Sequence, residues 1–122
     1  MSRHAPPGWP RQIPPPGSEG WQERATNWLL DTSPAEYRGY HVLRRHPVLL
    51  AWLAERNVAA QLEAARGAYA RARAELGDLV DPEVVAELLG VLESDGARLL
   101  ALQRETRLVA ESLRGQTYVP RL

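Results

Sequence analysis

Along two long segments of the chain, a series of residues, most of them hydrophobic, recurs at alternating intervals of three and four positions. The first series lies in the middle of the chain and consists of Val58, Leu62, Ala65, Tyr69, Ala72 and Leu76. The second lies nearer the C-terminus and consists of Val85, Leu88, Leu92, Asp95, Leu99, Leu102, Thr106, Val109 and Leu113. This spacing is typical of helices that pack along one coiled-coil seam. The pattern therefore predicts long helices over about residues 47–76 and 82–114.

The segment between these helices predicts a tight turn. Gly77 suits the left-handed conformation that ends many helices, and Pro82 suits the first turn of the next helix. A turn this short places two helices side by side in opposite directions. We therefore expect an all-α fold built on a long antiparallel helical hairpin. In such a hairpin the numbers of facing residues add up to about 161, as for Tyr69 and Leu92.

Two short helices are predicted before the hairpin. One stripe of hydrophobic residues consists of Trp21, Ala25, Trp28 and Leu29. This stripe indicates an amphipathic helix over about residues 19–30. Ser33 is placed to cap a second helix, and Glu36 stands three residues later, where it completes a capping box. The second short helix is therefore expected over about residues 34–45.

The segment VLLAWLA at residues 48–54 is hydrophobic on every side of its helix. A helix of this kind is expected to be enclosed all round. Because the segment lies at the open end of the hairpin, we expect both short helices to pack there. Tyr37, Tyr40 and Leu43 fall on one helical face and are assigned to that core. The turn end of the hairpin is expected to stay thinly covered.

The two ends of the chain differ in character from its helical part. Six of the ten prolines fall in residues 1–17, which cannot form a helix or an inner strand. We expect Trp9 and Ile13 to hold this proline-rich arm against its own domain, with a docking peptide as the alternative. A single helical domain is expected over residues 18–115. For the tail at residues 116–122, folding back and docking to a partner both stay open.

Composition narrows the chemistry that the chain can carry. Its 15 Lys+Arg balance 15 Asp+Glu, so no overall field attracts polyanions. Every basic residue is Arg, and the absence of Lys and Cys excludes Schiff bases, P-loop lysines, thiol nucleophiles and thiolate metal sites. No catalytic or phosphate-binding motif is present. We therefore expect a protein that is not an enzyme and holds no cofactor and no metal.

Neither a membrane span nor a targeting segment is indicated. The longest hydrophobic run, at residues 48–54, is far shorter than the roughly 20 residues that a membrane span needs. The N-terminal sequence MSRHAPPGWP lacks the hydrophobic core of a signal peptide. We therefore expect a cytoplasmic protein with no membrane contact.

The segment at residues 37–46 is the densest mixture of aromatic, Arg and His residues in the chain. Arginine and histidine side chains can contact phosphates, while tyrosines can stack on bases. The alternative function is therefore binding of nucleic acid or a phosphorylated ligand, although a neutral chain disfavours nucleic acid. The candidate binding residues are Arg38, His41, Arg44 and Arg45.

Two further charged features lie on the predicted hairpin. Asp95 occupies a seam position, where an unpaired charge would be costly, and Arg66 is expected opposite. We predict that these residues form a structural polar pair, with a general base in the bundle as the alternative. Residues 78–96 hold six acidic residues and no Arg. We interpret them as a solvated acidic tip, with a cation or partner site as the alternative.

The hydrophobic stripe of the second long helix is wider than one seam needs. Leu89, Leu100 and Leu108 widen it, and we expect Leu89, Gly96 and Leu100 to form an interaction surface. The favoured function is a helical protein-protein interaction module, such as a small adaptor, regulator or assembly subunit. Its expected partner is another protein or a second copy of the chain in a homodimer.

Overall fold

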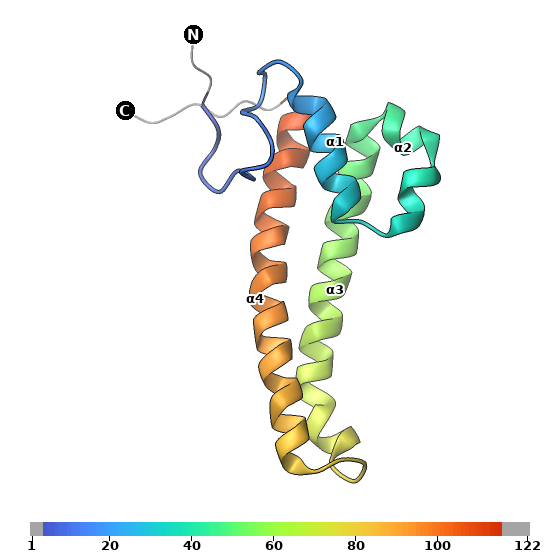
Figure 1. Ribbon diagram of the computed structural model, residues 1–122, viewed down its shortest axis with the longest axis vertical. Coiled ribbons are helices and arrows are strands. Elements are labelled where there is room, and N and C mark those ends of the chain that lie inside the picture. Colours follow the sequence, from blue (N-terminus) through green and yellow to red (C-terminus); the bar gives the residue numbers. More distant parts are fainter. Residues whose placement is uncertain (1–3, 116–122) are drawn as a thin grey trace. The chain divides into compact units, whose positions relative to one another are not determined.

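The computed structural model describes residues 4–115, and every regular element within them is helical (Figure 1). In chain order these are α1 (Trp21–Asp31), the 3-10 helix η1 (Ala35–Gly39), α2 (His41–Arg45), α3 (Pro47–Leu76) and α4 (Pro82–Leu113). The predicted all-α class is confirmed, and both long helices lie within one residue of their predicted ends. None of the described helices is long and apolar enough to cross a membrane. The predicted tail at residues 116–122 lies outside the described part.

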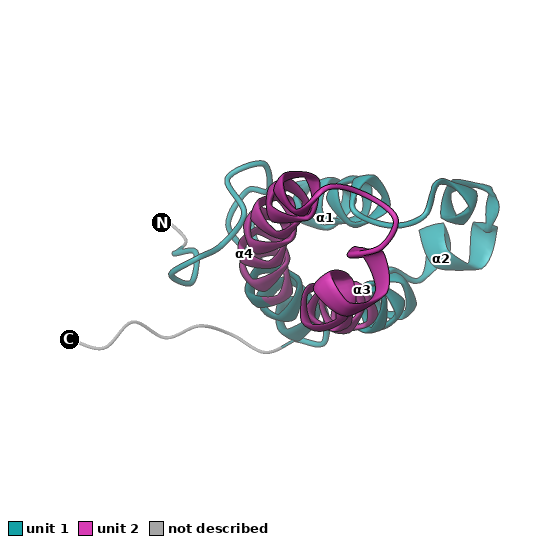
Figure 2. Ribbon diagram, turned by 90° about the horizontal axis from the view of Figure 1, so that it is seen from below, with its two compact units in different colours: residues 1–57, 104–122 teal, residues 58–103 magenta. Residues whose placement is uncertain are grey.

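The chain divides into two compact units (Figure 2). Unit 1 comprises Met1–Asn57 and Arg104–Leu122, and unit 2 comprises Val58–Gln103. Both long helices contribute residues to both units. Unit 2 is a helical hairpin, whereas unit 1 adds the arm and the short helices to one end of α3 and one end of α4.

The hairpin of unit 2 is held by hydrophobic contact along one seam. Its buried cluster near the turn consists of Ala72, Val85 and Leu89, with Leu76, Leu88 and Leu92 packed against it. Most of these residues belong to the two series that the heptad spacing assigned to the seam. The pattern therefore identified the contact that joins α3 to α4 in this unit.

The turn of unit 2 uses Gly77 for a reason other than the predicted one. The positive φ angles of the described glycines do not include Gly77, so the left-handed end predicted there is wrong. Its amide donates to the Arg73 carbonyl at 3.1 Å, which continues the helical pattern. A Cβ at this position would lie 2.7 Å from the same oxygen. Glycine is therefore required at position 77 because the backbone comes close there. Gly115, which follows α4, does adopt a positive φ, of 88°.

Unit 1 buries the stripe that predicted α1. The exposed fractions of Trp21, Ala25, Trp28 and Leu29 are 8%, 0%, 9% and 0%. From the long helices the buried residues of this unit include Leu50, Ala51, Ala54, Val109 and Ala110. A third helix is thus available in unit 1 to cover hydrophobic residues of the long pair.

In the described part of the proline-rich arm, Trp9 and Ile13 hold the chain to its own unit, as expected. Ile13 is buried, and the indole Nε1 of Trp9 donates to the carbonyls of Ile13 and Pro14 at 2.9 and 3.2 Å. The rings of Trp9 and Trp21 lie 6.1 Å apart, centroid to centroid. The indole that a docking peptide would have offered is therefore engaged within the chain.

The second short helix differs from its prediction. Residues 34–45 form η1 and α2 instead of one helix, because Tyr40 between them has an extended backbone. The predicted capping box does not form, since the Ser33 hydroxyl donates to the Leu29 carbonyl of α1 at 2.7 Å. Bonding of Ser33 back to the preceding helix competes with capping of the next one.

The expectation that residues 48–54 are enclosed on every side is also wrong. Leu50, Ala51 and Ala54 are buried and share one face of α3, whereas Val48, Leu49 and Trp52 are 42%, 44% and 51% exposed. Tyr40, which was assigned to the core beside this segment, is 52% exposed. The short elements η1 and α2 bury only Leu43 among their own residues, which is too little to cover a second face of α3.

We predict that Leu29→Ala lowers the free energy of unfolding by about 2–5 kcal/mol, because it leaves a cavity in a fully buried site. The matched change Leu79→Ala, at a side chain that is 73% exposed, should cost no more than about 0.5 kcal/mol. Urea unfolding followed by far-ultraviolet circular dichroism measures both. Equal losses for the two variants would contradict the assignment of the core.

Candidate functional site

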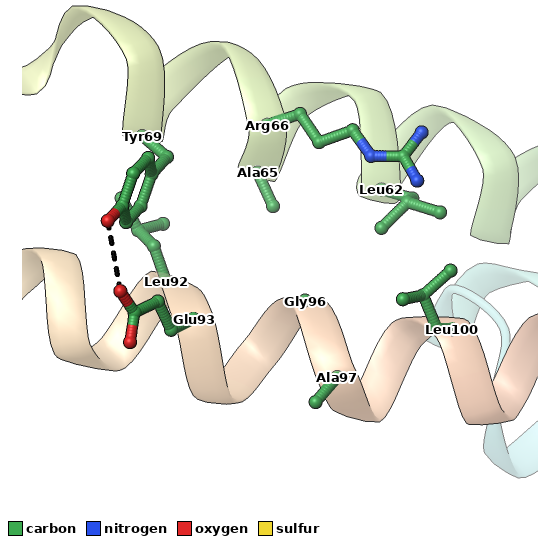
Figure 3. Close-up of a pocket in the computed structure, with 9 residues that line it drawn as sticks. All are labelled: Leu62, Ala65, Arg66, Tyr69, Leu92, Glu93, Gly96, Ala97 and Leu100. Atoms are coloured by element: carbon green, nitrogen blue, oxygen red, sulfur yellow. Dashed lines mark hydrogen bonds between the residues drawn. The ribbon is translucent and has the colours of Figure 1, made fainter.

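An open groove of about 430 Å³ lies between α3 and α4 within unit 2 (Figure 3). From α3 it is lined by Leu62, Ala65, Arg66 and Tyr69, and from α4 by Leu92, Glu93, Gly96, Ala97 and Leu100. Most of these side chains are hydrophobic, and Tyr69 and Leu100 are 39% and 37% exposed. The groove therefore offers a hydrophobic surface that unit 2 does not cover by itself.

Small residues form the centre of the groove. Ala65 and Gly96 face each other across it, with Leu62 and Leu100 at one end and Tyr69 and Leu92 at the other (Figure 3). Apart from the neighbouring residues and backbone of its own helix, no atom lies within 4 Å of a Cβ built on Gly96. The space at the centre is thus open because the sequence places small side chains there.

One hydrogen bond joins the two helices at an end of the groove. The Tyr69 hydroxyl donates to the Glu93 carboxylate at 2.9 Å. This bond raises the pKa of Tyr69 above its ordinary value of 10.0, because ionisation would place a second negative charge beside Glu93. The nearby charge of Arg73 acts in the opposite direction but is the smaller influence.

A second cavity of about 320 Å³ lies beside the turn. It is lined by Arg73, Gly77, Pro82, Val85 and Ala86. Arg73 follows Arg66 of the groove by seven residues, and Ala86 precedes Glu93 by seven, so both cavities lie on one face of the hairpin. The uncovered face of unit 2 therefore extends from the groove to the turn.

The polar pair predicted across the seam is replaced by ion pairs within each helix. Arg66 lies 3.6 Å from Glu63, and Asp95 lies 2.8 Å from Arg98. Both arrangements follow the i, i+3 spacing that brings side chains together on a helix surface. The prediction failed because it placed Asp95 in the seam, whereas its carboxylate reaches a nearer Arg at the surface.

The three residues expected to form an interaction surface divide between core and groove. Leu89 is 4% exposed and belongs to the hairpin core, so it is not available at the surface. Gly96 and Leu100 line the groove. The Tyr69–Glu93 contact was missed, although the numbers of its residues add up to 162, close to the predicted value.

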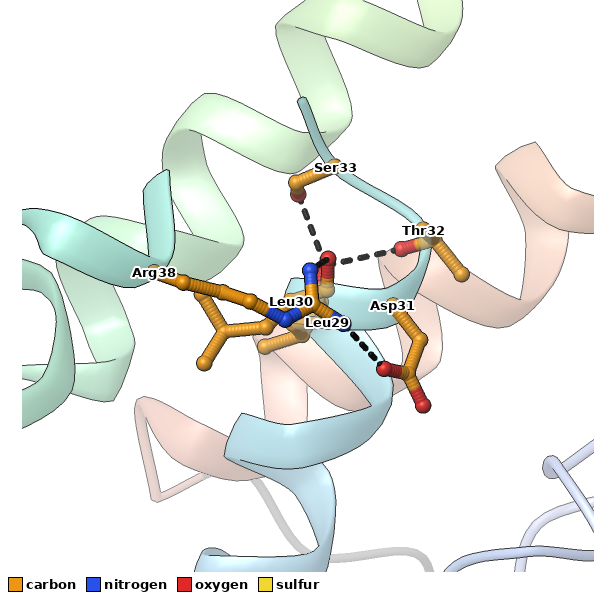
Figure 4. A network of polar contacts seen from close by, with 6 residues as sticks. All are labelled: Leu29, Leu30, Asp31, Thr32, Ser33 and Arg38. Atoms are coloured by element: carbon orange, nitrogen blue, oxygen red, sulfur yellow. Dashed lines mark hydrogen bonds and ion pairs between the residues drawn. The ribbon is translucent and has the colours of Figure 1, made fainter. Parts of the chain in front are cut away.

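Arg38 and Arg44, two of the four residues of the alternative binding cluster, form contacts within unit 1. Arg38 donates to the Leu30 carbonyl at 3.1 Å and pairs with Asp31 (Figure 4). Those contacts lie at the C-terminal end of α1, where orphan carbonyls need donors. The Arg44 Nε in turn donates to the Arg38 carbonyl at 3.0 Å.

The other two members of that cluster, His41 and Arg45, are exposed. Among the described residues no group of three His, Cys, Asp or Glu side chains could hold a metal ion. Half of the candidate cluster therefore has a structural role, and the groove of unit 2 is the more complete site.

We predict that Tyr69 ionises above the ordinary tyrosine pKa, and that Glu93→Gln lowers its pKa towards 10.0 by removing the carboxylate charge. Because the folded pKa is the raised one, the contribution of this bond to stability is present below pH 10.0 and lost as the pH rises through the raised value. Ultraviolet titration at alkaline pH, with Tyr69→Phe to assign the signal, measures the shift. An unchanged titration in Glu93→Gln would contradict the assignment.

No family model, no curated protein and no solved structure matches this chain.

Proposed function

We propose that the protein is a non-enzymatic interaction module whose unit 2 groove binds an amphipathic helix of a partner protein. The observation that carries the proposal is a hydrophobic groove between two helices with a centre of small residues. Helix-in-groove binding is a recurrent mode of peptide recognition and places hydrophobic anchors of the ligand at helical spacing. A third helix in this position would complete a bundle around the hairpin.

The chemistry of the groove favours a helix over a reacting substrate. Its only carboxylate, on Glu93, and its only hydroxyl, on Tyr69, are hydrogen-bonded to each other. Small side chains such as Ala65 and Gly96 allow a partner backbone or a large side chain to come close. An inserted Leu or Ile would then bury hydrophobic surface, which stabilises association by about 25 cal/mol per Å² before the costs of binding are subtracted.

The charged groups beside the groove suggest the character of the partner helix. Arg66 lines the α3 side and is 59% exposed, while Glu93 lines the α4 side. A ligand helix with an acidic residue near Arg66 and a basic residue near Glu93 would complement both. Such exposed pairs contribute little affinity and mainly set orientation. The aliphatic residues of the ligand would supply most of the binding.

We predict that Gly96→Leu fills the groove and weakens binding of a helical ligand at least about tenfold, the effect expected of a blocked anchor position. The open space at Gly96 admits the new side chain, and leucine favours the helix more than glycine. Gly67→Leu, also in open space but outside the groove lining, is the matched control and should bind like the wild type.

The ligand for this test comes from a displayed library of amphipathic helical peptides selected on the wild-type protein. Enriched sequences should carry aliphatic residues at i, i+3 or i+4, and i+7, and their affinities can be measured by fluorescence anisotropy. Selection of no helical peptide, or equal affinity for Gly96→Leu and Gly67→Leu, would remove the groove as the binding site.

A further inference from the structure

The N-terminal part of α3 carries an exposed hydrophobic patch in unit 1. We define the α3 patch as Val48, Leu49, Trp52 and Arg56. Val48 and Leu49 stand four and three residues before Trp52, so the three share one face of the helix. The guanidinium carbon of Arg56 lies 3.9 Å from the centre of the Trp52 ring. Trp52 is 51% exposed, and Trp and Arg are both enriched among the residues that dominate binding at the centres of protein interfaces.

The surroundings of the α3 patch are positively charged. The first turn of α3 contains no acidic residue, so the partial positive charge of its N-terminus is not offset there. Arg45 and Arg56 form no ion pair with any described residue. Glu55, which precedes Arg56 on α3, pairs instead with Arg114 at 3.7 Å. The patch therefore suits a hydrophobic surface that bears negative charge.

A surface of that kind lies at the turn of unit 2. We define the turn patch as Leu79, Val80 and Val84, which are 73%, 41% and 48% exposed, together with the acidic residues Asp78, Asp81 and Glu83. None of the three carboxylates forms an ion pair with a described residue. Hydrophobic side chains and unpaired negative charges thus occur together within seven consecutive residues.

We propose that the α3 patch of one molecule binds the turn patch of a second copy, so that the protein self-associates head to tail. In this contact Leu79 and Val84 pack against Trp52 and its aliphatic neighbours, while the turn carboxylates face Arg45 and Arg56. Two different surfaces meet, so the contact is heterologous, and in an open chain of copies one patch of each kind stays free at the ends. The association can therefore extend beyond a dimer.

Charge favours a second copy as the occupant. The formal net charge of the chain is zero, so copies do not repel each other as a whole, and opposite local charges can align them. Nucleic acid would complement only the basic surface and would leave the turn patch exposed. Two of the four residues expected to contact phosphates, Arg38 and Arg44, are engaged within unit 1, which further favours a protein surface over nucleic acid.

The test uses one variant for each surface. Trp52→Glu places a negative charge in the α3 patch, and Leu79→Arg places a positive charge in the turn patch. Both side chains are at least half exposed, so neither change disturbs a core. We predict that each variant weakens self-association at least about tenfold, as loss of a central interface residue does. Sedimentation equilibrium over a wide range of protein concentration measures the effect against the monomer mass of 13.6 kDa.

Mixing the two variants provides the decisive measurement. Trp52→Glu retains an intact turn patch, and Leu79→Arg retains an intact α3 patch, so an equimolar mixture can form one native contact per pair. We expect the mixture to reach a dimer and go no further, whereas the wild type continues to larger species. Raising the salt from about 0.05 M to about 0.5 M should weaken both associations by screening the charges.

Matched controls add the same charges outside both patches. Gln22→Glu on α1 and Gln61→Arg on α3 change exposed residues and should associate like the wild type. Gly96→Leu should also leave self-association unchanged, because it blocks only the groove. Helix binding and self-association can therefore fail independently of each other.

Three results would overturn the proposal. The wild type would sediment as a monomer at every concentration, or either variant would associate like the wild type, or the mixture would not dimerise. Binding of a labelled single-stranded RNA oligonucleotide is measured in parallel. Should a monomeric wild type bind the RNA and Trp52→Glu lose it, the α3 patch would be a nucleic-acid site instead.

Discussion

The number of helices available to cover each hydrophobic face governs this structure. Two helices that pack along one seam bury a single line of residues on each, and they leave both flanks of the seam in solvent unless a third element covers them. In unit 2 the seam buries Val85 and Leu89, but Leu100 beside it stays exposed, and a groove of about 430 Å³ results. Unit 1 has the additional helix α1, whose own residue Leu29 is completely buried. The groove is therefore left uncovered because unit 2 has only two helices, and the small residues Ala65 and Gly96 open its centre.

Contacts between charged groups contribute little to the packing of α3 against α4. The ion pairs of Arg66 and Asp95 lie within single helices and are exposed, so each contributes little to holding α3 and α4 together. The hydrogen bond from Tyr69 to Glu93 does cross between the helices, but it lies at the surface. Hydrophobic contact along the seam is left as the main force in the hairpin. In the proposed contacts with a partner, exposed charges would mainly set the orientation of the two surfaces.

Sequence alone predicted the long elements and failed at local contacts. Heptad spacing identified α3, α4 and their seam because a pattern that repeats several times along each helix averages out single exceptions. The spacing could not predict that Ser33 donates a hydrogen bond to α1, or that Asp95 pairs with Arg98. Such contacts depend on the distances between individual groups. Two of the three residues predicted to form an interaction surface, Gly96 and Leu100, line the groove. Its Tyr69–Glu93 contact required the relative rotation of two helices, which spacing fixes only approximately.

Residues 48–54 show why a hydrophobic segment does not prove enclosure. Periodicity states how many faces are hydrophobic, but the remaining chain decides how many of them can be covered, and the few residues of η1 and α2 cannot cover a second face of α3. The exposed ring of Trp52 is partly covered by Arg56, whose guanidinium carbon lies 3.9 Å from the ring centre. This cation–π contact restricts both side chains before any partner arrives. A surface ordered in advance loses less conformational entropy on binding, so this contact would favour the proposed self-association through Trp52.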